Sequence, residues 1–139
     1  MRITAKAASR QEAEKMIVPV QKDIESRLGN AVYGYDDDPM EMIVIKSLRE
    51  KEMYLALAES CTGGHVTDLI TNIPGASDVL LESCVTYSNE AKVKRLGVSE
   101  DTLKKYGAVS SQTAYEMAEG IRKISGADIG AAITGIAGP

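Results

Sequence analysis

The sequence predicts an α/β protein. We expect a layered domain over residues 39–139, with a largely parallel sheet flanked by helices, after a partial β-α-β segment over residues 1–38. Helix-like and strand-like apolar patterns alternate along the second part, which is typical of parallel strands joined by helices. The chain has six Tyr but no Phe or Trp, so its core must be aliphatic. Three consecutive aspartates at 36–38 mark the expected boundary.

The first part is predicted to fold as strand, helix, strand. Arg2–Ala7 alternates between polar and apolar residues, as a short strand does. Ser9 begins a helix with a capping box, and Gly29 ends it. Pro19 lies inside this helix and predicts a kink or a division into two shorter helices. Ala31–Tyr35 is the second expected strand.

The second part opens with strong signals for a helix start. Asp38 can cap the helix, and Pro39 suits its first position. Turn residues and apolar spacing then divide the rest of the chain. The expected helices are 39–50, 66–73, 88 or 89 to 95, 99–107 and 114–124, and the expected strands are 54–58, one within 79–87, and 128–134.

Composition excludes several classes of protein. No apolar run approaches the roughly 18 residues that a membrane-spanning helix needs. The net charge of −4 gives no basic excess for nucleic-acid binding. Cys61 and Cys84 are far apart, and the lone His65 adds no ligand cluster, so we expect no metal site and no cofactor. Free thiols and the absence of a signal peptide indicate a cytoplasmic protein.

The turn Ser60–Gly64 is the first candidate site, because it follows a predicted strand and precedes a helix. In an open α/β sheet, ligands bind beyond the carboxyl ends of the strands. The turn could supply a nucleophile or cradle a phosphate. Alternatively, it is an ordinary helix entry capped by Thr62. Cys61 could also be the nucleophile, although a buried, inert thiol is the commoner fate of a free cysteine.

Two further strand exits carry polar and glycine residues. In the segment Thr86–Lys92, Ser88 or Asn89 caps a helix, which places Lys92 in its first turn. The helix dipole should lower the pKa of that lysine and allow it to activate a serine. The alternative is a solvated lysine on a basic helix face. The third exit is Thr134–Pro139, and a parallel sheet would bring all three exits to one edge.

Four motifs together resemble the CinA (competence/damage-inducible protein A) family. Their order and spacing match that family's C-terminal domain, a nicotinamide mononucleotide deamidase, and residues 1–38 resemble the end of its KH-like connecting domain. The motifs are Ala58–Gly64, Val85–Lys92, Gly107–Ser110 and Thr134–Pro139.

The resemblance implies an amidohydrolase that converts nicotinamide mononucleotide to nicotinic acid mononucleotide and ammonia. It implies Ser60 as nucleophile, Lys92 as its base and Tyr87 as a positioning or relay group. We expect a small-molecule nucleotide as the partner and a homodimer as the assembly. A non-catalytic nucleotide-binding or dimerisation module is the alternative. The expected substrate contacts are Thr62, Gly63, Gly64, Asn89, Thr134 and Gly135.

Two departures from the family pattern stand out. Ser83-Cys84 replaces the usual Gly-Gly pair, and its side chains are expected to crowd the sheet or a neighbouring subunit. The family also continues beyond the position of Pro139. We therefore expect a fragment of a longer protein, and we expect activity of the complete domain rather than of these 139 residues alone.

Overall fold

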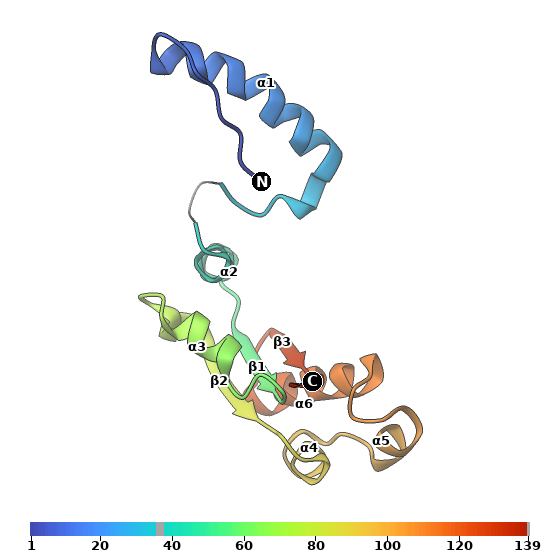
Figure 1. Cartoon of the computed structure of the whole chain (residues 1–139). Helices are drawn as coiled ribbons and strands as arrows, with labels where there is room; N and C mark the ends of the chain where they lie inside the picture. The colour runs from blue at the N-terminus through green and yellow to red at the C-terminus, as the bar shows by residue number, and fades with distance from the viewer. Residues whose placement is uncertain (36–37, 139) are drawn as a thin grey trace. The chain divides into compact units, whose positions relative to one another are not determined.

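The computed structural model describes residues 1–35 and 38–138. The chain divides into two compact units, Met1–Asp38 and Pro39–Pro139 (Figure 1). Two of the aspartates expected to mark the boundary, at 36 and 37, lie outside the described residues. Within the described stretches, none of the helices combines the length and the apolar character needed to cross a membrane.

The first unit contains one long helix, α1 (Arg10–Leu28). Ser9 caps it as expected, since its hydroxyl accepts a hydrogen bond from the Glu12 amide at 3.2 Å. The expected division at Pro19 is wrong: the helix runs through the proline, which removes a single backbone hydrogen bond from a long helix. Gly29 ends α1 with a φ of 51°, a conformation that favours glycine.

The two strands expected on either side of α1 are not formed. Residues 2–7 carry no strand pairing, and 31–35 follow a short 3₁₀ turn, η1 (Gly29–Ala31), without joining a ladder. An alternating pattern predicts which face of a strand would be buried, but a strand also needs a neighbour for its backbone groups. Neither segment finds one among the described residues.

The second unit contains every helix and strand expected from the sequence. The expected start of its first helix, however, is wrong by one residue. Pro39 occupies the position before the first helix, and no side chain caps that helix, so Asp38 lies one residue too early. A 3₁₀ turn, η2 (Ala76–Asp78), precedes the second strand. The elements are α2 (Met40–Glu50), β1 (Leu55–Glu59), α3 (His65–Thr71), β2 (Leu80–Val85), α4 (Asn89–Leu96), α5 (Glu100–Tyr106), α6 (Ser111–Ser125) and β3 (Ile129–Ile133).

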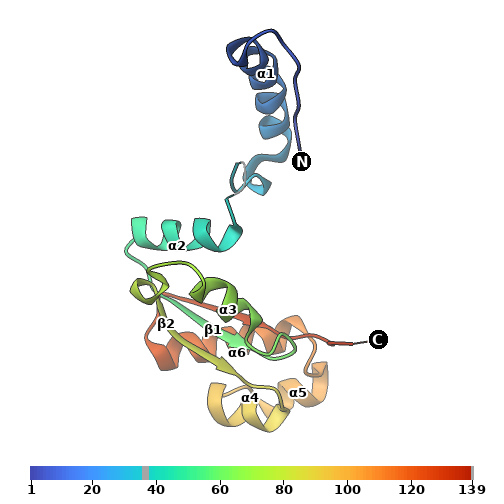
Figure 2. The same ribbon diagram turned by 60° about the vertical axis from the view of Figure 1, so that its left-hand side comes forward.

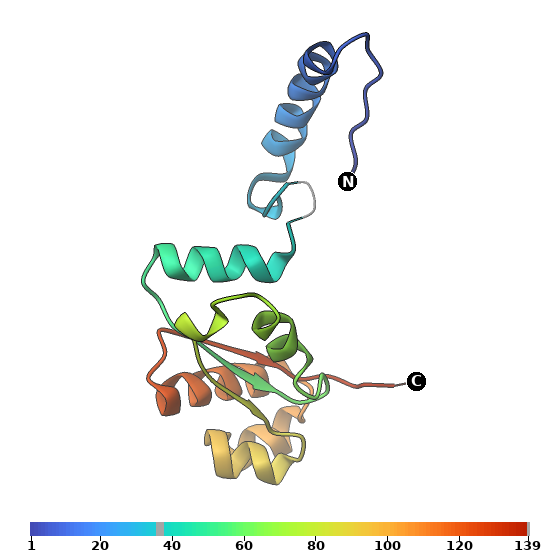
Figure 3. The ribbon, with the colours of Figure 1, turned by 90° about the vertical axis from the view of Figure 1, so that its left-hand side faces the viewer.

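The sheet has three parallel strands in the order β2-β1-β3. β1 is central and all five of its residues are buried. Figure 3 shows the three arrows pointing the same way, so the carboxyl ends of the strands meet at one edge. The three polar strand exits predicted from the sequence therefore lie at that edge.

Helices cover both faces of this sheet. Alternate residues of β1 supply the two cores, because successive side chains of a strand point to opposite faces. Leu55 and Leu57 pack with residues of α2 and α3, while Ala56 and Ala58 pack with residues of α4 and α6. Figure 2 shows α2 and α3 on one side of the strands and α4, α5 and α6 on the other.

Two glycines allow α6 to approach its neighbours closely. A Cβ atom at Gly130 of β3 would collide with the backbone carbonyl of Ala118 in α6. One at Gly120 of α6 would collide with the carbonyl of Leu96 at the end of α4. The core between β1, α4 and α6 therefore leaves little space between its layers, which suits a chain that lacks Phe and Trp.

Candidate active site

Ser60 and Lys92 meet at the carboxyl edge of the sheet. Ser60 is the first residue after the central strand β1, and Lys92 lies in the first turn of α4. Lys92 Nζ donates a hydrogen bond to Ser60 Oγ at 3.0 Å. The Lys92 residue is only 1% exposed and Ser60 is 6% exposed, so the reading of Lys92 as a solvated surface lysine is wrong.

The other partners of Lys92 define how its proton can move. Its Nζ also donates to the backbone carbonyls of Thr86 at 2.8 Å and Tyr87 at 3.1 Å. A neutral amine has two N–H donors and one lone pair, and carbonyl oxygens can only accept. When Lys92 is neutral, its lone pair must therefore face Ser60, which is the partner able to donate a proton.

Burial lowers the pKa of Lys92, while the nearby Cys61 thiol acts in the opposite direction. The direction agrees with the sequence prediction, but the main cause differs. The sequence suggested the helix dipole, whereas desolvation of the ammonium inside the domain dominates. Cys61 itself is a free, half-buried thiol.

Glu59 is a buried charged residue of this site that the sequence analysis missed. It precedes Ser60, is fully buried, and accepts hydrogen bonds from the turn and the start of α3. Burial alone would raise its pKa, but the hydrogen bonds from Thr62 and Thr67 lower the pKa to about 2. The one available signal was an acidic residue at the end of an otherwise apolar strand.

The turn itself differs from the expected arrangement. Gly63 and Gly64 adopt positive φ angles of 64° and 104°, which favour glycine. The Gly63 amide donates to the Ser60 carbonyl at 3.0 Å, and the Gly64 amide donates to Glu59 Oε2 at 3.1 Å. Two of the three amides expected to bind substrate, those of Gly63 and Gly64, are therefore already engaged. Gly64, rather than Thr62, occupies the cap position of α3.

Two amides of the turn remain available. Within the described residues, the backbone N–H groups of Cys61 and Thr62 donate to no protein acceptor. The Thr62 hydroxyl donates to Glu59 Oε2 at 2.6 Å, so it is held inside the turn. These two amides belong to the residues that directly follow Ser60 in the chain. Donors next to a nucleophile could stabilise negative charge on the oxygen of a carbonyl that the nucleophile attacks.

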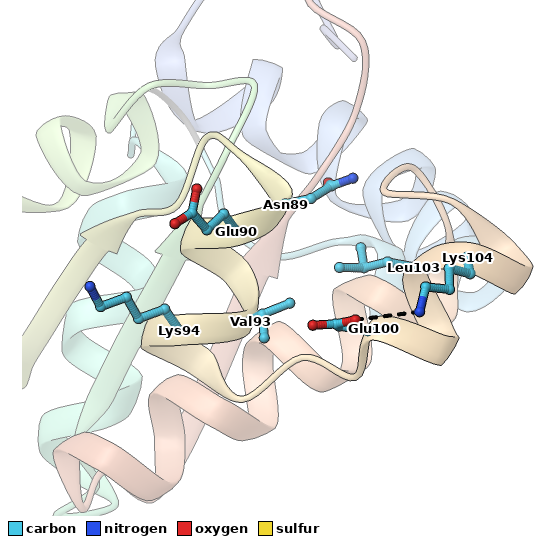
Figure 4. Close-up of a pocket in the computed structure, with 7 residues that line it drawn as sticks. All are labelled: Asn89, Glu90, Val93, Lys94, Glu100, Leu103 and Lys104. Carbon is cyan, nitrogen blue, oxygen red and sulfur yellow. Dashed lines mark hydrogen bonds and ion pairs between the residues drawn. The ribbon is translucent and has the colours of Figure 1, made fainter.

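Tyr87 and Asn89 flank Lys92 along the chain but differ in their surroundings. Tyr87 contacts Lys92 through its backbone carbonyl, while the residue is 68% exposed. Ser88 caps α4, because its hydroxyl accepts from the Ala91 amide at 3.1 Å. Asn89 lines a groove of about 460 Å³ between α4 and α5, together with Val93, Leu103 and charged side chains (Figure 4). Neither Ser60 nor Lys92 lines that groove.

The exit of β3 lies beside the exit of β1. A Cβ atom built on Gly135 would stand 3.0 Å from Cys61 Sγ. The Thr134 hydroxyl donates to the carbonyl of Ala108 at 2.8 Å and ties the loop before α6 to this edge. Thr134 and Gly135 therefore lie at the same edge as Ser60, but the Thr134 hydroxyl is already engaged.

Ser83 is accommodated without crowding the sheet. Its hydroxyl forms a short hydrogen bond with the hydroxyl of Thr67, which in turn contacts Glu59. Cys84 is half-buried beside the second core, and burial raises the pKa of its thiol. The Thr86 hydroxyl is buried and has no hydrogen-bond partner within the described part of the chain.

The fold and the site together define a parallel α/β domain with a buried Ser–Lys pair at the carboxyl end of its central strand. Residues 37–139 match the family model "CinA C-terminal domain", and residues 1–34 match "Damage-inducible protein CinA KH domain". The chain belongs to the CinA family. The match confirms the resemblance inferred from the four motifs.

Relatives and solved structures agree with this assignment. The chain is 52% identical over all 139 residues to a CinA-like protein of Kosmotoga olearia, of which it covers 34%. It resembles the competence/damage inducible protein CihA of Agrobacterium tumefaciens, with a TM-score of 0.69, 43% identity, and coverage of 71% of this chain and 60% of that one.

A CinA superfamily protein of Escherichia coli gives a TM-score of 0.71 at 32% identity, with 81% of this chain and 68% of that one covered. The chain thus spans about a third of the length of the curated relatives it matches.

Proposed function

We propose that this domain is an amidohydrolase acting on nicotinamide mononucleotide, with Ser60 as nucleophile and Lys92 as general base. One observation carries the mechanism: Lys92 Nζ lies 3.0 Å from Ser60 Oγ, and its other two partners are carbonyls. The substrate is the one implied by the resemblance to the CinA deamidase domain. Nicotinic acid mononucleotide and ammonia are the proposed products.

The first half of the reaction forms an acyl-enzyme. Neutral Lys92 takes the Ser60 proton while Oγ attacks the carboxamide carbon. The amides of Cys61 and Thr62 are the donors proposed to stabilise the oxyanion. The Lys92 ammonium then returns its proton to the leaving nitrogen, the C–N bond breaks, and ammonia departs.

The second half releases the acid. Lys92, neutral again, takes a proton from a water molecule that attacks the ester carbon. The tetrahedral intermediate collapses, and Ser60 Oγ leaves with the proton from Lys92. The product is a carboxylic acid, which ionises by giving its proton to water. This sequence consumes one water for each amide and needs no metal or organic cofactor.

Other expected contacts remain part of the proposal. Tyr87 is proposed to position the substrate through its exposed side chain, and Asn89, Thr134 and Gly135 to bound the substrate site. Gly63 and Gly64 contribute by shaping the turn rather than by donating amides. We also propose a cytoplasmic homodimer.

Ammonia release from nicotinamide mononucleotide tests the proposal. The assay is run on the 139-residue chain and on the same chain extended by the following segment of a CinA relative, since this chain covers about a third of such proteins. Ser60→Ala should abolish release, and Ser111→Ala, at an exposed serine of α6, should not. Wild-type rates in Ser60→Ala would refute the mechanism.

A non-catalytic nucleotide-binding module is the second candidate. One observation favours it: the three oxygen acceptors around Lys92 Nζ also satisfy a permanently charged ammonium. Such a lysine could not accept the Ser60 proton. Isothermal calorimetry that shows nucleotide binding, with no ammonia released from the extended chain, would favour this alternative.

A further inference from the structure

The turn after β1 already contains an anion, the carboxylate of Glu59. Both carboxylate oxygens are engaged, and the residue has no solvent exposure. Oε1 accepts from the Thr67 amide at 2.8 Å and the Thr67 hydroxyl at 2.7 Å. Oε2 accepts from the Thr62 hydroxyl at 2.6 Å and from the amides of Gly64 and Val66, each at 3.1 Å.

These donors are the ones that a bound phosphate would use. Amides at the start of a helix converge on negative charge, and a glycine-rich turn lets the backbone approach it. Here the amides of Gly64, Val66 and Thr67 point at Glu59 instead. A phosphate at this place would have to displace a buried carboxylate that carries a full charge.

Glu59 and Ser60 act on opposite faces of the sheet. Successive residues at a strand end point to opposite sides. The contacts of Glu59 all come from the turn and α3, whereas Ser60 Oγ is bonded to Lys92 of α4. Because the two residues share a peptide bond, rotation of Glu59 would also turn Ser60 away from Lys92.

We propose that Glu59 is a positioning residue: its carboxylate fills the anion-binding turn, fixes Ser60 against Lys92, and excludes the substrate phosphate from the turn. The inference deepens the proposed amidase function and rests on it for its kinetic consequences. It also assigns a role to the turn that the sequence left open between phosphate cradle and reactive site.

Two hydrogen-bonded hydroxyl groups, those of Thr67 and Ser83, connect the Glu59 carboxylate to β2. A carboxylate only accepts hydrogen bonds, so the Thr67 hydroxyl must donate to Glu59, and Ser83 must then donate to Thr67. Ser83, which departs from the glycine usual in the family pattern, thereby joins the support of Glu59. Thr67 is the residue whose hydroxyl links Ser83 directly to Glu59.

The first test is NMR of backbone amides in the wild-type chain titrated with inorganic phosphate. We expect no saturable shift at Gly64, Val66 or Thr67, because Glu59 holds these amides. Saturable shifts at these three residues would overturn the exclusion of phosphate. The measurement needs no turnover, so its result is independent of whether the domain is an amidase.

The second test compares Thr67→Val with Thr67→Ser. The valine variant loses the hydroxyl that binds Glu59, and the serine variant keeps it. We expect the amide signals of Ser60, Cys61 and Thr62 to move in Thr67→Val and to return toward wild type in Thr67→Ser. Thr71→Val, at an exposed position of the same helix, is the control. Unmoved signals at 60–62 in a folded Thr67→Val would refute the positioning role.

Kinetics in the extended chain supply the third test. Glu59→Gln should lower kcat by about 10²-fold, the cost of a misplacement near 1 Å, while KM changes less than about twofold. A rise in KM alone would contradict the inference and assign the turn to substrate binding. If Glu59→Gln does not fold, the Thr67 pair provides the same comparison of kcat with KM.

Discussion

Replacement of Lys92 by methionine separates the chemical role of the lysine from its structural one. Methionine has a similar length and fits a buried aliphatic site, but it offers no donor and no lone pair. In the fold, Lys92 is only 1% exposed and its amine has three oxygen partners. The substitution therefore removes the proposed base while the site stays filled.

The substitution is expected to lower both kcat and the free energy of unfolding, and each loss has its own physical cause. A positioned general base contributes about 10²–10⁴-fold, and kcat should fall within that range. The carbonyls of Thr86 and Tyr87 lose their hydrogen-bond donor. Each of them that water does not reach lowers the free energy of unfolding by about 1–3 kcal/mol. The variant no longer has to desolvate an amine in the interior, and this gain offsets part of the cost. The free energy of unfolding should thus fall by less than about 6 kcal/mol, the upper value for the two carbonyls together.

The assay pairs ammonia release with thermal unfolding in the extended chain. Lys94→Met is the matched control, because Lys94 lies in the same helix but is exposed. We expect wild-type activity in Lys94→Met and a large loss in a folded Lys92→Met. Retention of more than about a tenth of wild-type kcat in folded Lys92→Met would refute the assignment of Lys92 as the base.

Three further outcomes follow from the geometry. Activity should rise with pH through the lowered pKa of Lys92, because only the neutral amine accepts a proton; a pH–rate profile that is flat up to pH 10 would contradict this. The pKa of Glu59 is lowered to about 2, so its stabilising effect is complete above its unfolded value near 4.3 and is lost as the pH falls toward 2. Acid unfolding should accordingly be less steep in Glu59→Gln than in wild type. Gly130→Ala should lower the free energy of unfolding by about 1–3 kcal/mol or more, because its Cβ meets the Ala118 carbonyl, and an unchanged denaturant midpoint would contradict that close packing.

The sequence predicted the second unit well because its signals are local. Capping serines, turn glycines and apolar spacing mark most of its helices and strands, and the serine caps of α4, α5 and α6 agree with the structure. The parallel order of the strands then brings Ser60 and Lys92 to one edge, although they are 32 residues apart. The pair could therefore be inferred from the positions of two strand exits.

Features that depend on the folded packing around a residue were not predictable from local sequence patterns. Residues 2–7 alternate like a strand but find no neighbour. The pKa of Lys92 is set by burial, which no local pattern reveals. Glu59 resembled a polar residue at the start of a loop, and only the folded turn shows that Thr62 and Thr67 bind it.

Trapping the acyl-enzyme tests the central claim most directly. The extended chain is mixed with nicotinamide mononucleotide, quenched in acid within milliseconds, digested and mapped by mass spectrometry. The mechanism predicts a nicotinic acid mononucleotide ester on the peptide that contains Ser60, and none in Ser60→Ala. Ammonia release at wild-type rate from Ser60→Ala, or an acyl group on Cys61 in place of Ser60, would contradict it.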